Sequence, residues 1–124
     1  MNYFLLTSAT LSIIVGLVHS MLGELLIFKH FRKNSIVPTI TKPPLRERNL
    51  RIIWASWHIA SILGWAFGAI LFYLSINGEI TTPVLIRVII ISMLAAGSLV
   101  LFATKARHPG WIGLFGVAIC SWLA

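Results

Sequence analysis

The segment "LVHSMLGELLIFKHFRK", residues 17 to 33, joins the end of a long apolar run to a cluster of positive charge. Such a change, from side chains that dissolve in lipid to side chains that need water or headgroups, is typical of the end of a membrane-spanning helix. The apolar part also contains two ionisable residues, His19 and Glu24. Ionisable groups inside a membrane are costly, so these two mark a candidate functional site.

The composition of the whole chain extends this membrane interpretation. Of the 124 residues, 58% are hydrophobic and 10% are charged, which a soluble domain of this size could not accommodate without large exposed apolar patches. Four apolar runs predict four helices, at about residues 3–28, 52–76, 84–104 and 109–124. The first three reach the roughly 20 residues needed to cross a bilayer, and the fourth is shorter. The sequence therefore predicts a single membrane domain over residues 1–124.

The positive charges predict how these helices are oriented. The net charge is +7, and nine of the ten basic residues lie either in the 29–51 loop or just before the fourth helix. Because basic loops stay on the cytoplasmic side, both segments should be cytoplasmic and both termini outside. Short connections elsewhere favour antiparallel neighbours. The predicted fold class is an all-α, integral membrane, four-helix antiparallel bundle.

The basic loop has a predicted partner, the anionic headgroups of membrane lipids. A nucleic acid is disfavoured because the loop is short, is interrupted by Pro38, Pro43 and Pro44, and has no aromatic platform. The basic residues closest to the helix ends are expected to form a positive rim over the polar site. These are Arg46, Arg48, Arg51, Lys105 and Arg107.

The polar residues of the first two helices predict a shared site. His19 belongs to a stripe of small and polar residues on the first helix, and His58 belongs to a similar stripe on the second. Such stripes mark the helix faces that pack on other helices. Residue counts place both histidines at similar depth, because the two helices are antiparallel. We therefore expect His19 and His58 to face each other, with Glu24 and His108 toward the cytoplasmic opening.

Glycines on two helices predict where helices approach closely. The second helix contains Gly64-x-x-x-Gly68, and the fourth contains Gly110, Gly113 and Gly116. Small residues at these spacings let helix backbones come near each other in a membrane. The same pattern suits packing within the chain and packing between chains, so a homo-oligomer is a further possible arrangement.

Two kinds of cofactor fit the predicted site. Haem b could be ligated axially by His19 and His58, with Arg48, Arg51 or Arg107 at its propionates. Three glycines would give the macrocycle room: Gly16, Gly23 and Gly64. A transition metal such as zinc, iron or copper could instead be held by His19, Glu24, His58 and His108. Either group would explain why ionisable side chains, each costing about 2.5 to 3.5 kcal/mol in mid-membrane, are gathered together. The first functional hypothesis is therefore a membrane protein that binds haem or a metal ion and could be redox-active.

Three other functions remain open. Glu24 and His19 could be the titrating groups of a proton-coupled transporter for a small solute. The polar residues could only fix helix packing in a structural or accessory membrane subunit. Glu24, His58 and the basic rim could also hold a phosphorylated headgroup in a lipid-processing enzyme. Whether the chain is an enzyme is left undecided by these alternatives.

Several motifs resemble those of known membrane proteins. The stretches "VHSMLGE", "WHIASILGW" and "ATKARHPGW" are similar to signature stretches of small four-helix bacterial inner-membrane proteins with no assigned activity. That resemblance implies the architecture and no particular chemistry. The four-helix outline with a first-helix glutamate also resembles the small multidrug exporters, although these need a glutamate near mid-membrane. His19, followed by a basic helix end, is similar to four-helix membrane proteins that bind haem through a first-helix histidine.

Overall fold

The computed structural model describes all 124 residues, and its only regular secondary structure is helical. Its helices are α1 (Tyr3–Leu22), a π-helical turn (Gly23–Ile27), a 3-10 turn (Phe28–Phe31), α2 (Glu47–Asn77), α3 (Thr82–Thr104) and α4 (Gly110–Leu123). The prediction of an all-α chain with four helices is confirmed. Three segments are long and apolar enough to cross a membrane: Tyr3–Phe31, Glu47–Asn77 and Thr82–Thr104.

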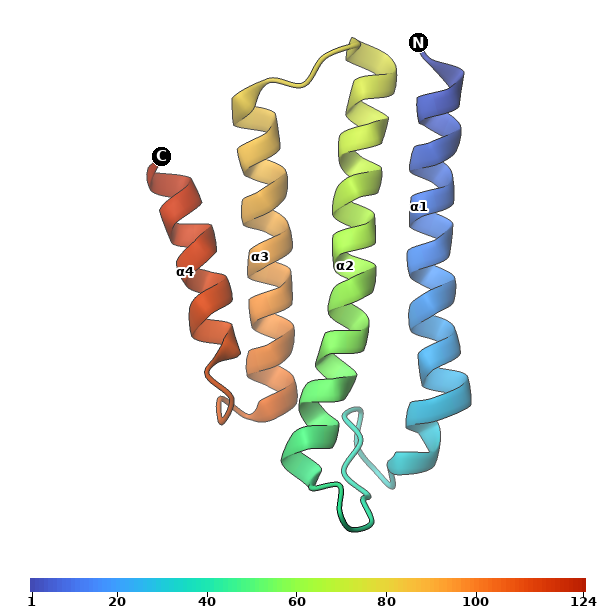
Figure 1. Cartoon of the computed structure of the whole chain (residues 1–124), viewed down its shortest axis with the longest axis vertical. Coiled ribbons are helices and arrows are strands. Elements are labelled where there is room, and N and C mark those ends of the chain that lie inside the picture. Colours follow the sequence, from blue (N-terminus) through green and yellow to red (C-terminus); the bar gives the residue numbers. More distant parts are fainter.

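The four helices lie side by side in one row, antiparallel and in sequence order (Figure 1). α1 packs on α2, α2 on α3 and α3 on α4, while α1 and α4 form the two edges of the row. The antiparallel order agrees with the prediction, but a bundle in which the fourth helix returns to the first is not formed. An open row is tolerable in lipid, because apolar side chains that face acyl chains need no protein cover.

The basic loop is shorter than predicted, because α2 begins at Glu47 rather than Ile52. Leu50, one turn into the helix, is buried, and Arg51 Nε donates to Glu47 Oε1 at 2.7 Å across one helical turn. These contacts extend the helix into a charged segment that hydropathy alone leaves outside it. The connection between the helical segments therefore spans residues 32–46 instead of 29–51.

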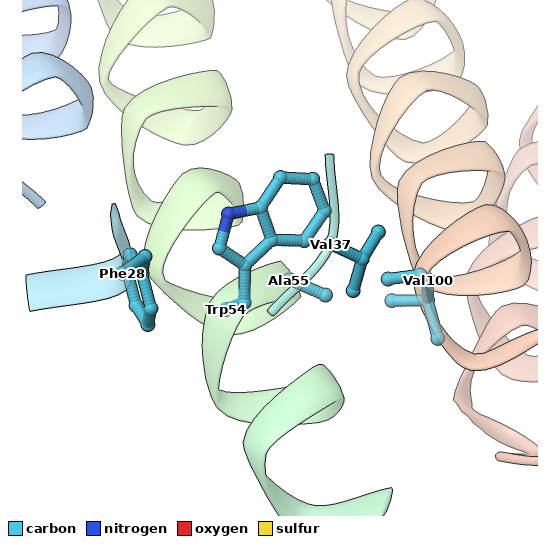
Figure 2. Packing of buried hydrophobic residues seen from close by; sticks show 6 residues of the cluster. Phe28, Val37, Trp54, Ala55 and Val100 are labelled. Carbon is cyan, nitrogen blue, oxygen red and sulfur yellow. The ribbon is translucent and has the colours of Figure 1, made fainter. Parts of the chain in front are cut away.

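Part of this connection folds back into the protein. Val37 is buried between α2 and α3, in a cluster that includes Trp54, Ala55 and Val100 (Figure 2). Backbone N–H groups of Thr39 and Ile40 both donate to the carbonyl oxygen of Phe31, at 2.8 Å each. The segment is thus an ordered cover over one end of the row, where the sequence predicted only a charged loop.

Small residues bring α1 and α2 together, as predicted. Ser12 Oγ donates to the carbonyl oxygen of Gly64 at 2.7 Å. At Gly68 a Cβ atom would lie 3.3 Å from the carbonyl oxygen of Ala9, so the backbones are close there too. The prediction of close approach at Gly64-x-x-x-Gly68 is confirmed for the contact with α1.

The packing of α4 differs from the prediction. Phe115 of α4 lies over Gly97 of α3, so the small residue at this contact belongs to α3. A Cβ atom at Gly113 or Gly116 would meet nothing within 4 Å, and Cys120 is exposed. Gly113 and Gly116 therefore do not make the close contact of α4 with the rest of the chain.

The basic residues of the predicted rim gather at one end of the row. Arg51 Nη1 donates to the carbonyl oxygen of Ala103 at 3.0 Å, which ties the start of α2 to the end of α3. Lys105 and Arg107 lie in the turn that follows α3. At the opposite end, the backbone N–H of Asn2 donates to the carbonyl oxygen of Ser75 at 2.7 Å.

Candidate functional site

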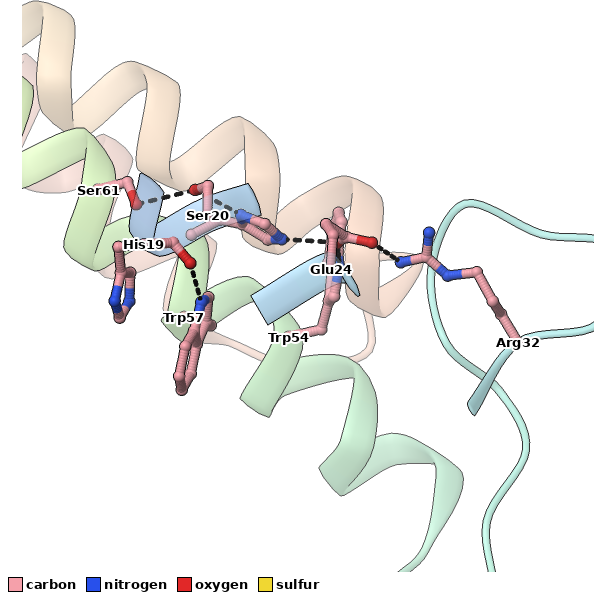
Figure 3. Close-up of polar contacts among 8 residues, drawn as sticks. His19, Ser20, Glu24, Arg32, Trp54, Trp57 and Ser61 are labelled. Carbon is pink, nitrogen blue, oxygen red and sulfur yellow. Dashed lines mark hydrogen bonds and ion pairs between the residues drawn. The ribbon is translucent and has the colours of Figure 1, made fainter. Parts of the chain in front are cut away.

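Glu24 is the centre of a polar network at the basic end of α1. Its Oε1 accepts hydrogen bonds from Trp54 Nε1 at 2.5 Å and from His58 Nε2 at 2.9 Å. Its Oε2 pairs with Arg32 Nη2 at 2.5 Å (Figure 3). Glu24 lies on the π-helical turn, Trp54 and His58 on α2, and Arg32 at the end of the 3-10 turn. One carboxylate therefore joins the end of the first helical segment, α2 and the start of the loop.

His58 extends the network through its second ring nitrogen. Nδ1 lies 2.9 Å from Ser20 Oγ, and Ser20 Oγ lies 2.8 Å from Ser61 Oγ. Because a carboxylate only accepts hydrogen bonds, Nε2 carries the proton in its bond to Glu24. Nδ1 then accepts from Ser20 or donates to it, according to how the serine hydroxyls are turned. The result is a continuous chain from Ser61 through Ser20 and His58 to Glu24.

Aromatic side chains shield this chain from water. The Trp54 ring contacts His58 edge to face, with ring centroids 4.8 Å apart, and Phe28 lies 6.2 Å from His58. Phe28 and Trp54 are buried, and the side chain of His58 is only 15% exposed. A low local dielectric strengthens hydrogen bonds and makes an unpaired polar group expensive. The network is thus both strongly held and sensitive to the loss of any member.

Arg32 supplies the positive charge opposite Glu24. It lies where the 3-10 turn ends and the extended loop begins, and its Nε atom is buried without a hydrogen-bond partner. The guanidinium group is therefore held mainly by the Glu24 carboxylate. Because the loop after Arg32 carries the buried Val37, this ion pair also connects the polar network to the cover over the end of the row.

The structure corrects the predicted pairing of His19 with His58. The His19 ring stacks on Trp57 at a centroid distance of 4.3 Å and 8° between planes, and it makes no ring contact with His58. Successive residues of an α-helix point about 100° apart, and it is Ser20, the next residue, that faces His58. His19 instead faces a groove, and neither of its ring nitrogens has a hydrogen-bond partner in the protein.

The other predicted ligands lie elsewhere. His108 Nδ1 accepts from the backbone N–H of Gly110 at 3.1 Å, which satisfies the start of α4. Arg51 is bound to Glu47 and Ala103, and Arg48 is exposed on the first turn of α2. Of the four predicted metal ligands, only Glu24 and His58 contact each other. No group of three or more His, Cys, Asp or Glu side chains is placed to hold a metal ion.

Part of the space expected for a haem ring is filled. Gly16 and Gly23, which would have made room for the macrocycle, are covered by the indoles of Trp65 and Trp57. Ring atoms of these tryptophans lie where a Cβ atom would be placed. The two indoles therefore occupy the space beside Gly16 and Gly23, while Gly64 keeps open space around it. Haem binding stays a prediction.

Four members of the network had no assigned partner in the sequence analysis: Ser20, Arg32, Trp54 and Ser61. Ser20 and Glu24 are four residues apart, as are Trp54 and His58, and Ser61 follows His58 by three. Residues at these spacings share one face of a helix. A search for polar and aromatic pairs at this spacing would have found every member except Arg32, which lies beyond the helix.

A groove between α1 and α2 adjoins the network and was not predicted. Its volume is about 530 Å³, and its lining residues are Ser8, Leu11, Ser12, Val15, Gly16, His19, Ala60, Ser61 and Gly64. Ser61 belongs to both the groove and the hydrogen-bonded chain. The polar network therefore leads from the basic end of the row to a hollow between the first two helices.

Comparison with known proteins gives no relative from which to transfer a function. No protein-family model matches the chain, and no curated protein or solved structure is significantly similar to it. The resemblance to small bacterial inner-membrane proteins therefore stays a prediction. The functional argument rests on the geometry of Glu24, His58 and the groove.

Proposed function

We propose that the chain is a membrane protein that passes protons between Glu24 and the α1–α2 groove and couples this transfer to the movement of a small solute. The observation that supports the proposal is the use of both ring nitrogens of His58, one toward Glu24 and the other toward Ser20. An imidazole can take a proton at one nitrogen and release one from the other. His58 is therefore a natural link between a carboxylate and a chain of hydroxyl groups.

The energetics favour a role beyond packing. Each ionisable side chain in mid-membrane costs about 2.5 to 3.5 kcal/mol on insertion scales. Hydrogen bonds between membrane helices stabilise the packed state by only about 0.6 kcal/mol each on average. Helix packing alone can be achieved more cheaply with small apolar residues, as at Gly68 and Ala9. Glu24 and His58 lie within candidate membrane spans and can change charge, so they suit a function that uses proton transfer.

The ion pair with Arg32 supplies a means of coupling. For this transfer, the hydroxyl groups of Ser61 and Ser20 both turn toward His58. The Nε2 proton of His58 passes to Glu24 Oε1, and Nδ1 takes a proton from Ser20. Ser20 takes one from Ser61, and Ser61 takes one from a hydronium ion in the groove. The carboxyl group then becomes neutral, and the imidazole and both hydroxyl groups keep their protons. The attraction of the carboxyl group for Arg32 falls, because the pair loses one of its two charges. Arg32 begins the segment that covers the basic end of the row. Protonation of Glu24 would in this way loosen the cover and open the site.

Proton transfer can be measured with the purified protein in lipid vesicles that contain a pH-sensitive dye. With the membrane potential clamped by potassium and valinomycin, we expect an imposed pH gradient to dissipate faster than in protein-free vesicles. Glu24→Gln and His58→Phe should slow the protein-dependent rate about a hundredfold, the usual scale for a lost acid–base group. Glu79→Gln is the matched control, because Glu79 is exposed and belongs to no ion pair. A Glu24→Gln rate equal to wild type would refute the relay.

We also propose that the basic end of the row faces the cytoplasm of a bacterium, with both termini outside the inner membrane. Reporter fusions test this orientation. A fusion after Lys42, in the basic loop, should be active only as a cytoplasmic reporter, and a fusion after Ala124 only as an external one. An external reporter that is active after Lys42 would reverse the topology, because the loop charges would then lie on the wrong side.

Haem b or a transition metal stays a separate prediction with a direct test. Purified protein can be examined by absorption spectroscopy for a Soret band and by elemental analysis for a stoichiometric metal. A Soret band that disappears in His58→Ala would show that His58 binds haem, and it would refute the proton relay. The contacts of His58 with Glu24 and Ser20 favour the relay, because they already occupy both ring nitrogens.

A further inference from the structure

We propose that the groove between α1 and α2 is a binding site for an uncharged amphipathic molecule that carries a hydroxyl group, with His19 as its main polar contact. That this molecule is the transported solute rests on the proposed function. The binding site itself is argued from the lining of the groove.

The size and charge of the groove limit what it can bind. About 530 Å³ lies within the range of small-molecule sites, which run from roughly 300 to 1,000 Å³. None of its nine lining residues carries a permanent charge. A charged ligand would have no counter-charge there and would carry a large desolvation cost. The groove therefore suits a neutral molecule.

His19 provides a hydrogen-bonding group without a partner. Its ring is held in place by stacking on Trp57, whose Nε1 donates to the backbone oxygen of His19 at 3.0 Å. A neutral imidazole has one donor and one acceptor nitrogen, and neither is bonded within the protein. Leaving both unpaired in an apolar setting is costly. A hydroxyl group can accept from one imidazole and donate to another group nearby, so it satisfies this position.

The serines of the groove favour a ligand that donates. Ser8 Oγ donates to the carbonyl oxygen of Phe4 at 2.9 Å, and Ser12 Oγ donates to that of Gly64 at 2.7 Å. Each hydroxyl hydrogen is thus used, while each oxygen can still accept. The groove presents acceptor oxygens together with the imidazole of His19. A ligand hydroxyl matches this set better than a carbonyl, which has no hydrogen to donate.

The remaining lining is apolar and reaches the outer surface of the helices. Leu11 is 56% exposed and Val15 63% exposed, so this side of the groove opens toward the lipid-facing surface. An apolar body can enter from the bilayer and lie against these side chains and Ala60, while its hydroxyl group reaches His19. The two kinds of lining together define an amphipathic ligand.

Gly64 offers a position from which a side chain can fill part of the groove. A Cβ atom there would meet only the carbonyl oxygen of Ser12, at 3.9 Å, which is ordinary contact. A longer side chain would extend into the groove, which Gly64 lines. Gly113→Leu is the matched control, because a Cβ atom at Gly113 on α4 meets nothing within 4 Å and lies outside the groove.

The test compares 1-naphthol with naphthalene, which has the same fused rings but no hydroxyl group. Protein labelled with nitrogen-15 histidine is placed in lipid nanodiscs, and each probe is added at a known mole fraction in the lipid. We expect 1-naphthol to shift the His19 ring resonances in a saturable way and naphthalene to bind about tenfold more weakly, as expected for one lost hydrogen bond. Gly64→Leu should abolish saturation, and Gly113→Leu should preserve it.

His19→Phe keeps an aromatic ring on Trp57 and removes only the nitrogens. For this variant, binding is followed by the fluorescence of 1-naphthol and naphthalene, and the preference for 1-naphthol should be lost. Equal binding of the two probes to wild type, or unchanged saturation in Gly64→Leu, would overturn the site. The two proposals can fail separately. Saturable binding at His19 together with a wild-type proton rate in Glu24→Gln would refute the relay and leave the groove site standing.

Discussion

Replacing Glu24 by alanine should lower the free energy of unfolding by about 1.5 to 3 kcal/mol, the range for hydrogen bonds to a charged group, because the pair with Arg32 is only partly buried. The carboxylate accepts from Trp54 and His58 and pairs with Arg32. Its removal leaves a guanidinium group and two N–H donors without an acceptor among buried aromatic side chains. The effect can be measured by denaturant titration of the helical signal in mixed micelles.

Glu47→Ala is the matched control for this prediction. Glu47 also pairs with an arginine, Arg51, but its side chain is 52% exposed and the pair spans one turn of the same helix. Exposed pairs of this kind contribute about 0.3 to 0.5 kcal/mol. If Glu24→Ala and Glu47→Ala lowered the free energy of unfolding by the same small amount, Glu24 would be an ordinary surface carboxylate. The network would then not hold the end of α1 against α2.

The helices could be predicted from the sequence because the apolar runs are long and clearly bounded. The arrangement of those helices could not. Hydropathy identifies side chains that avoid water, but lipid and a neighbouring helix satisfy an apolar side chain about equally well. Nothing in the sequence of α4 therefore distinguishes a helix that closes a bundle from one that ends a row. The buried Val37 was missed for a related reason, because a single apolar residue in a basic loop has no periodicity to mark it.

The candidate site was predicted in part. Glu24 and His58 were predicted to belong to one site because an ionisable residue inside an apolar helix needs a partner, and their side chains contact each other in the structure. His19 was predicted to face His58, but Ser20 does so, because a stripe of small and polar residues is too broad to separate neighbours about 100° apart. Arg32 could not be placed, since the π-helical and 3-10 turns before it change the helical spacing.

Two tryptophans occupy the space beside Gly16 and Gly23 that the sequence analysis assigned to a cofactor. The sequence marks Gly16 and Gly23 as positions where something approaches α1 closely, and it does not say what approaches. In the structure the approaching groups are Trp65 and Trp57, and the indole of each donates to a backbone oxygen of α1, at Ile13 and His19. The glycines thus provide room for indoles that fix the register of α2 against α1, and part of the space expected for a cofactor is used by the protein itself.

This role of the glycines predicts a second large effect. Gly23→Ala should destabilise the protein by about 1 to 3 kcal/mol, the usual cost of an added methyl group in a well-packed site. The new Cβ atom would overlap the indole of Trp57, so either that ring or the backbone of α2 must move. Because Trp57 also stacks on His19, the ring resonances of His19 should shift as well. Unfolding titrations and histidine-selective spectra measure the two effects in one preparation.

Gly113→Ala separates this overlap from the general effect of alanine in a helix. A Cβ atom at Gly113 meets nothing, so the substitution should be neutral or stabilising by up to about 1 kcal/mol through helix propensity. Removing the indole provides the second comparison. In a Trp57→Ala background, Gly23→Ala should cost nothing, because the atoms that it would strike are gone. A full loss that persists in that background would place the strain in the π-helical turn instead of the contact between α1 and α2.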